Sequence, residues 1–256
     1  MLGAIIGDLV GSVYEWNNIK TTEFEFLKRE CFFTDDSVLT MATASALLTG
    51  SGYAETYHRF ARCYPGRGYG GRFKAWIHSD NPQPYNSWGN GSAMRVSPVG
   101  FAFNCVDEVL AEAEASAVVT HNHPEGIKGA QATALSVLLA RQGATLTEIR
   151  DEITTRFGYN LTRTLVEIRP VYRFDESCQG TLPESITAFL ESTGFEDAIR
   201  KAISIGGDSD TIACITGGIA EAYYGIPNDI AQQAYRYLPH EFIEIIEMFN
   251  KRYRRD

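Results

Sequence analysis

Residues 206–225 read GGDSDTIACITGGIAEAYYG and join an acidic turn to the most apolar helical segment of the chain. From Ile212 to Tyr224 the segment is rich in alanine and isoleucine, and Gly225 follows it as glycine commonly follows a helix. The Gly217-Gly218 pair weakens a helix intrinsically. We therefore expect this pair to let the backbone of a neighbouring element pack closely against the helix.

Helical patterns also cover most of the remaining sequence. Period-two alternation is rare, and its nearest example, Val166 to Phe174, is interrupted by Pro170. The stretch from Tyr64 to Pro98 is expected to be irregular, and no repeat, linker or shift in composition marks a domain boundary. The sequence therefore predicts a single all-α domain over residues 1–256. Further helices are expected over 36–48, 106–120, 124–142, 184–191 and 195–204.

The overall charge and the cysteines limit the classes of function. The chain has 256 residues and a net charge of -9, from 32 acidic and 23 basic side chains. An acidic surface repels phosphate backbones, which argues against a general nucleic-acid partner. Five widely spaced cysteines fit a disulfide framework badly and indicate a reducing compartment. With no leader pattern and no apolar run long enough to cross a bilayer, a cytoplasmic location and no membrane partner are expected.

Two acidic motifs lie where helices are expected to begin. Each is explained by simple N-capping when it is considered alone, since Asp, Ser and Thr accept hydrogen bonds from free first-turn amides. A cap needs one acceptor, however, and each motif offers several. Together they supply four carboxylates and two hydroxyls with no His or Cys, a donor set that suits two hard dications such as Mg²⁺. The six candidate ligands are Thr34, Asp35, Asp36, Asp208, Asp210 and Thr211.

Three further features are candidates for binding or catalysis. Glycine-rich segments at 66–71 and 87–91 would let backbone amides approach a phosphate, although ordinary turns explain glycines equally well. Trp88 offers a stacking face for a nucleobase and Asn90 a hydrogen bond to a sugar or phosphate. His121, between two helices, could cap a helix or touch an anion. Glu15 lies between two aromatic residues, a setting that could raise its pKa, but it could equally be a surface glutamate.

The order of these motifs resembles the ADP-ribosylglycohydrolase family. Gly7-Asp8 with Glu15, Thr34-Asp35-Asp36-Ser37 and Gly68-Tyr69-Gly70 come first, and then Ser87-Trp88-Gly89-Asn90-Gly91, Thr120-His121 and Gly207-Asp208-Ser209-Asp210-Thr211. The resemblance spans about residues 3 to 227. The paired Thr-Asp-Asp and Asp-x-Asp-Thr signatures are its specific part.

The resemblance implies a fold, cofactors and roles for individual residues. It implies an all-α, single-domain orthogonal helical bundle with two Mg²⁺ or Mn²⁺ ions held at helix N-termini by the six candidate ligands. It also implies proton transfer by Glu15 with ligand aspartates Asp36 and Asp208 in the catalytic centre. Some members use an aspartate between the two glycine loops; here Asp80 is the only one, and its surroundings differ from the family pattern. The implied substrate-binding residues are Gly68, Gly70, Ser87, Trp88, Gly89, Asn90, Gly91 and His121.

The implied activity is hydrolysis of the N- or O-glycosidic bond between ADP-ribose and a modified acceptor. The expected partners are an ADP-ribosylated protein or a small ADP-ribose conjugate, with nucleic acid only as a modified substrate, and the expected state is a monomer. Two other functions remain open: a non-catalytic ADP-ribose-binding or structural protein, and a metal phosphohydrolase that cleaves the diphosphate. The linkage that is cut and the choice between Mg²⁺ and Mn²⁺ also stay open.

Overall fold

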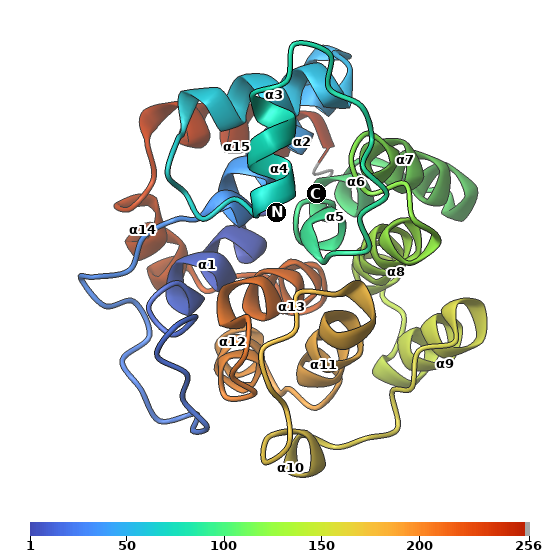
Figure 1. Ribbon diagram of the computed structural model, residues 1–256. Helices are drawn as coiled ribbons and strands as arrows, with labels where there is room; N and C mark the ends of the chain where they lie inside the picture. The colour runs from blue at the N-terminus through green and yellow to red at the C-terminus, as the bar shows by residue number, and fades with distance from the viewer. Residues whose placement is uncertain (254–256) are drawn as a thin grey trace.

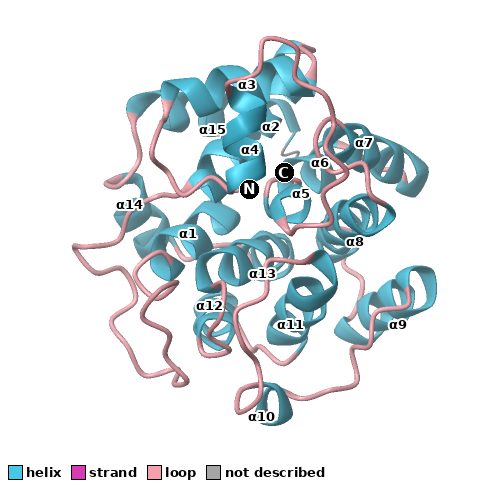
Figure 2. Cartoon of the chain, in the orientation of Figure 1, coloured by secondary structure: helices cyan, strands magenta, loops and turns pink. Residues whose placement is uncertain are grey.

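The computed structural model describes residues 1–253, and these residues are helical without any strand (Figures 1 and 2). One isolated antiparallel bridge joins Gly89 to Ser177. The predicted all-α fold is therefore confirmed. In chain order the helices are α1 (Leu2–Gly11), α2 (Asp35–Thr49), α3 (Tyr53–Cys63), α4 (Gly71–Ile77), α5 (Gly91–Met94), α6 (Ser97–Ala102), α7 (Val106–Val118), α8 (Pro124–Arg141), α9 (Leu146–Phe157), α10 (Leu165–Ile168), α11 (Cys178–Leu190), α12 (Phe195–Ile203), α13 (Ser209–Tyr224), α14 (Asn228–Tyr235) and α15 (His240–Tyr253).

Helix α13 lies at the centre of the molecule, with α1, α11 and α12 beside it (Figure 1). Its contact with α1 is the closest in the fold, because glycines remove side chains from the interface. A Cβ on Gly7 would lie 2.0 Å from the carbonyl oxygen of Ala213, and one on Gly217 would lie 2.2 Å from that of Gly3. The expected close packing at Gly217 is thus confirmed, and its partner is the N-terminal helix.

The two ends of α2 show how the sequence sets its length. The Thr34 hydroxyl accepts a hydrogen bond from the backbone amide of Asp36 and caps the first turn. Gly50 ends the helix in the left-handed region, with φ of 72°, which glycine adopts without a steric penalty. Helix α2 therefore begins where the first acidic motif does, and its positive end faces the same region as that of α13.

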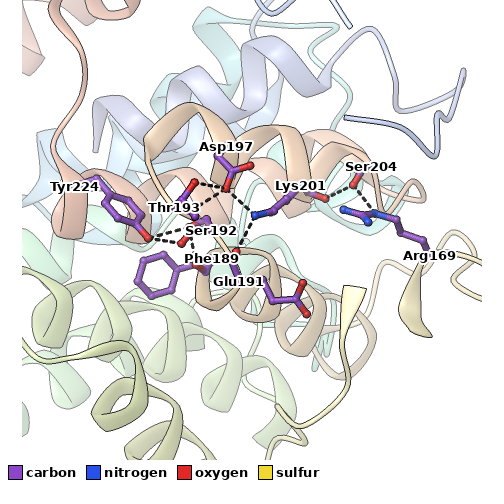
Figure 3. A network of polar contacts seen from close by, with 9 residues as sticks. All are labelled: Arg169, Phe189, Glu191, Ser192, Thr193, Asp197, Lys201, Ser204 and Tyr224. Atoms are coloured by element: carbon purple, nitrogen blue, oxygen red, sulfur yellow. Dashed lines mark hydrogen bonds and ion pairs between the residues drawn. The ribbon is translucent and has the colours of Figure 1, made fainter. Parts of the chain in front are cut away.

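A polar network fixes α12 on the elements around it (Figure 3). Asp197 accepts hydrogen bonds from the backbone amide and hydroxyl of Thr193 and forms an ion pair with Lys201 at 2.7 Å. The hydroxyl of Tyr224, at the end of α13, donates to the carbonyl of Ser192 in the loop before α12. Because α12 leads directly into the turn before α13, this network helps to fix the position of that turn.

Several expectations about single elements were wrong. The stretch from Tyr64 to Pro98 contains α4 and α5 and the start of α6, so it is not irregular throughout. The helix expected from Glu184 begins earlier, at Cys178, because the Ser177 hydroxyl caps it by accepting from the amide of Gly180. The segment from Val166 to Phe174, where Pro170 interrupts the alternation, forms no strand, as expected, and its first residues belong to α10.

Within residues 1–253, no helix combines the length and the apolar character that crossing a membrane requires.

We predict that Gly7→Ala strongly destabilises the protein. Alanine favours a helix intrinsically, but here its methyl group would overlap the backbone of α13, so the packing clash decides the sign. The free energy of unfolding, measured by chemical denaturation, should fall by at least about 2 kcal/mol. Gly52→Ala is the control, because a Cβ there meets nothing within 4 Å and its expected change is below about 1 kcal/mol. Equal stability of the two variants would show that the α1–α13 contact is not tight.

Candidate active site

A cavity of about 230 Å³ lies at the N-terminal ends of α2 and α13. It is lined by carboxylates from both helices, by Glu15 from the segment after α1, and by both glycine-rich loops. Residues that the sequence places far apart therefore meet in one space. The predicted site residues on its wall are Glu15, Asp35, Asp36, Gly68, Gly70, Ser87, Gly89, Asn90, Gly91, His121, Asp208, Asp210 and Thr211.

Asp8 anchors the beginning of α2 to α1. Its buried carboxylate accepts hydrogen bonds from the amide and hydroxyl of Thr34, at 2.9 and 2.7 Å, and from the amide and hydroxyl of Ser37. These donors favour the charged carboxylate, but burial outweighs them and raises the pKa of Asp8 to about 6. The carboxylate thus takes the role of an N-cap from a neighbouring helix.

The carboxylates gather in two groups of three. Oxygens of Asp8, Asp36 and Asp210 lie within 4.8 Å of one another, and so do oxygens of Glu15, Asp208 and Asp210. Asp210 belongs to both groups, which therefore adjoin. We call them the inner group, with Asp8 and Asp36, and the outer group, with Glu15 and Asp208.

Burial and mutual repulsion disfavour the charged state of these groups. Burial, followed by the fields of neighbouring carboxylates, raises the pKa values of Asp35, Asp36 and Asp210 well above the usual aspartate range. One oxygen of Asp36, Oδ1, is buried without a hydrogen-bond partner in the described residues. Oxygen donors that repel one another and include an orphaned atom fit a hard divalent cation. The carboxylates of the two groups are the residues that could hold it.

Glu15 is the half-buried member of the outer group. Burial raises its pKa to about 7, and the carboxylates of Asp208 and Asp8 add to the rise. Its aromatic neighbours are not the main cause: Trp16 is 75% exposed and stacks on Phe174 rather than enclosing the carboxyl group. Asn18 ties this segment to the turn before α13, because its amide donates to the carbonyls of Glu15 and Gly207 and accepts from the amide of Gly207.

The backbone of the two glycine loops lies directly against side chains of the site, because glycine has no Cβ that would clash with them. Gly68 has φ of +100°, and a Cβ there would lie 2.9 Å from the Asp35 carboxylate. A Cβ on Gly91 would lie 3.1 Å from Nε2 of His121. Each glycine therefore holds a loop directly against a predicted site residue.

Basic residues also line the cavity. Arg72, at the start of α4, donates to the carbonyl of Tyr85, and its guanidinium lies 5.2 Å from the centre of that ring. His121 is buried beside Tyr85, and burial together with Arg95 and Arg72 lowers its pKa well below the usual histidine range. The cavity wall thus combines carboxylates with a cation and a neutral imidazole.

Three predicted residues have contacts that the sequence did not indicate. The Asn90 amide already donates to the Asp208 carboxylate at 2.7 Å and to the Thr181 hydroxyl, so it holds a site carboxylate in place. The Thr34 hydroxyl binds Asp8 and does not line the cavity. Trp88 is 49% exposed, lies edge-on to His123 and is outside the cavity wall. Asp80 is exposed and also lies outside it.

The sequence reasoning missed Asp8, Arg72 and Glu176 as parts of the site. Asp8 lies in the inner group, whereas Arg72 and Glu176 line the cavity. A single acidic residue inside the apolar run of the first helix was the available signal for Asp8. Arg72 and Glu176 are exposed residues in or beside loops, and nothing in the sequence separates them from other surface charges.

Comparison with known proteins gives matches over nearly the whole chain. The sequence model of the family described as ADP-ribosylglycohydrolase matches residues 1–255. ADP-ribosylhydrolase ARH3 is 27% identical in Mus musculus and 28% in Homo sapiens, over 88% of this chain and 83% and 84% of those proteins. ADP-ribosylarginine hydrolase Tri1 of Pseudomonas putida is 24% identical, over 88% of this chain and 70% of that protein. A solved structure of an ADP-ribosylglycohydrolase-related protein complex superposes with a TM-score of 0.73 at 25% identity, covering 99% of this chain and 95% of that one.

We predict that Asp210→Asn stabilises the protein in chelator, and more so at higher pH. The folded-state pKa of Asp210 is raised, so the native state keeps a proton that the unfolded state loses, and stability falls as the pH rises through this window. Asparagine stays neutral and avoids that loss. The melting temperature of the variant should therefore match wild type at about pH 4, close to the unfolded-state pKa, and exceed it by a few degrees at pH 8.

Asp151→Asn, at an exposed position of α9, is the matched control and should show no such pH trend. A constant difference between Asp210→Asn and wild type over this pH range would contradict the proposed carboxylate repulsion.

Proposed function

The chain belongs to the ADP-ribosylglycohydrolase family, and we propose that it hydrolyses the N- or O-glycosidic bond between ADP-ribose and a modified acceptor with the help of two Mg²⁺ or Mn²⁺ ions. The observation that carries this proposal is the pair of carboxylate groups that share Asp210 on the wall of a cavity. The same wall offers Arg72, the neutral His121 and the glycine loops. The carboxylates would serve the cations and the ribose hydroxyls, and the hydrogen-bond donors would serve the diphosphate of such a substrate.

The aspartates of the inner and outer groups would hold the metal ions, with Asp35 and Thr211 beside them, which leaves Glu15 free for proton transfer. Bound ions of this kind neutralise the carboxylates, bind substrate hydroxyls and lower the pKa of water. Several contacts keep the acidic side chains in place before any ligand arrives. Asp8 fixes the first turn of α2, and Asn90 orients Asp208 through its amide.

Glu15 is the proposed proton-transferring group. Its carboxyl lies in the outer group and faces the cavity, and burial raises its pKa to about 7 in the metal-free protein. A carboxyl poised in this way can give a proton to the leaving group or take one from water. Since the bond breaks at a ribose anomeric carbon, the charge that develops there is positive, and the surrounding carboxylates stabilise it.

The glycine loops and Arg72 would position the rest of the substrate. The backbone of Gly70 and Gly89 comes close to the cavity, and Arg72 supplies a positive charge at its edge. Binding the diphosphate there holds the distal ribose over the carboxylates, so orientation supplies part of the rate. The acceptor would leave on the side of the exposed Trp16–Phe174 stack, next to Glu15.

We predict metal-dependent release of free ADP-ribose from at least one class of conjugate. Arginine-linked, serine-linked and nucleic-acid-linked ADP-ribose would be incubated with Mg²⁺, with Mn²⁺ and with chelator, and the products separated by chromatography. Asp208→Ala should abolish release without unfolding the protein, because the outer group loses a ligand. Asp151→Ala, at an exposed helical position, should keep full activity.

The product identifies the reaction. Release of AMP and ribose phosphate would support diphosphate cleavage in place of glycoside hydrolysis. Binding of ADP-ribose without turnover of any conjugate would support a non-catalytic reader, and full activity in a metal-free preparation would exclude the metal-dependent mechanism.

We further predict that Glu15→Gln lowers kcat by about two to four powers of ten, the usual contribution of general acid–base catalysis. Affinity for ADP-ribose, measured by calorimetry, should stay close to wild type, because glutamine preserves the size and the hydrogen bonding of the side chain. The pH dependence of kcat/KM near 7 should disappear in any residual activity. A variant with unchanged kcat would assign proton transfer to another group.

A further inference from the structure

Arg95 is a fully buried cation next to the cavity, and the described residues give it no carboxylate partner. Its Nη2 donates to the carbonyl of Ser116 at 2.8 Å and to the hydroxyl of Thr120 at 2.9 Å, and its guanidinium lies 4.2 Å from the ring centre of Tyr57. Nε and Nη1 are buried without partners in the described part of the chain. Arg95 lines the cavity, but these two atoms are closed off from solvent, and its hydrogen bonds connect it to the site through Thr120.

The contacts of Arg95 fix the direction of a hydrogen-bond chain. A guanidinium only donates, so the Thr120 oxygen must accept from it. The same oxygen lies 2.7 Å from Nδ1 of His121. Within residues 1–253 Nδ1 is the one acceptor in reach of the Thr120 hydroxyl proton, and a bond to it lets the hydroxyl accept from Arg95 and donate to the ring at once, which favours Nδ1 as the acceptor nitrogen.

It follows that the single proton of the neutral imidazole is on Nε2. This nitrogen faces the loop of the cavity wall, near Gly89 and Gly91, and the described residues place no acceptor on it. The groups around the ring disfavour a second proton: Arg95 and Arg72 are both positive, and Tyr85, 5.9 Å away, is a neutral ring. The imidazole therefore offers one donor to the cavity and keeps it at any pH near neutrality.

We propose that Arg95 and Thr120 are positioning residues that fix His121 in its Nε2-protonated form, so that it serves as a permanent neutral hydrogen-bond donor to an anionic oxygen of the ligand. The identity of that ligand as ADP-ribose rests on the proposed function above. A neutral donor suits this place, because a protonated histidine beside the buried guanidinium of Arg95 and the guanidinium of Arg72 would itself need a counter-charge.

The test is a pair of substitutions at Thr120 with a spectroscopic readout. Nitrogen-15 NMR of labelled histidine reports which ring nitrogen carries the proton, and His121→Gln identifies the signals of this ring among the five histidines. In wild type and in Thr120→Ser, which keeps the hydroxyl, Nε2 should be protonated and Nδ1 bare. Thr120→Val removes the donor to Nδ1, so we expect a mixture of the two tautomers.

Calorimetry with ADP-ribose gives the functional half of the test. Thr120→Val should bind about threefold to tenfold more weakly, as expected for the loss of one oriented hydrogen bond, and Thr120→Ser should match wild type. Thr133→Val is the control, because the Thr133 hydroxyl on α8 is equally buried but has no hydrogen-bond partner. It should change neither the tautomer nor the affinity.

Two results would overturn the proposal. One is a wild-type His121 that carries its proton on Nδ1, and the other is a Thr120→Val protein with the tautomer and affinity of wild type. If wild type shows the Nε2 proton but no affinity for ADP-ribose, the positioning of the ring stands and the proposed function fails. The NMR and calorimetric arms thus separate the two.

Discussion

The backbone contact between α1 and α13 is the constraint on which the other features of this protein depend. It brings two carbonyl-lined helix surfaces so close that side chains are excluded at Gly3, Gly7 and Gly217. The same contact places Asp8, from the middle of α1, next to Asp210, from the first turn of α13. Asp8 then fixes α2 through Thr34 and Ser37. The acidic site is therefore assembled by one helix pair, and the third helix is attached to it through a side chain of that pair.

Such a site opposes the stability of the fold that carries it. Buried carboxylates that repel one another raise the free energy of the native state whenever they are charged. The surrounding structure holds them through neutral donors: Asn90 on Asp208, and the hydroxyls on Asp8. None of these donors neutralises the negative charge of the carboxylates. The carboxylates are therefore held close together and keep a high affinity for cations. On the same cavity wall Arg95 is a buried cation, and its charge helps to keep His121 neutral.

The sequence predicted this fold class and most of the site because both are encoded locally. Helical patterns are local, and the two acidic motifs each lie at a helix start. Predicting that both motifs line one candidate site therefore needed only the assumption that the two helices meet. Contacts between distant loops are not encoded in this way. Nothing in the sequence near Asn90 shows that its amide turns toward Asp208, and nothing near Trp88 shows that its ring lies outside the cavity. The raised pKa of Glu15 was anticipated, but its main causes, burial and two distant carboxylates, appear only in three dimensions.

The membership of Asp210 in both carboxylate groups has a thermodynamic consequence. When one side chain serves two adjacent positions, occupation of either position by a proton or a cation changes the field and the geometry felt at the other. Linkage requires this influence to be equal in both directions, whatever the order of occupation. The two groups are therefore expected to titrate as one unit, with apparent constants that belong to the pair and not to any single aspartate.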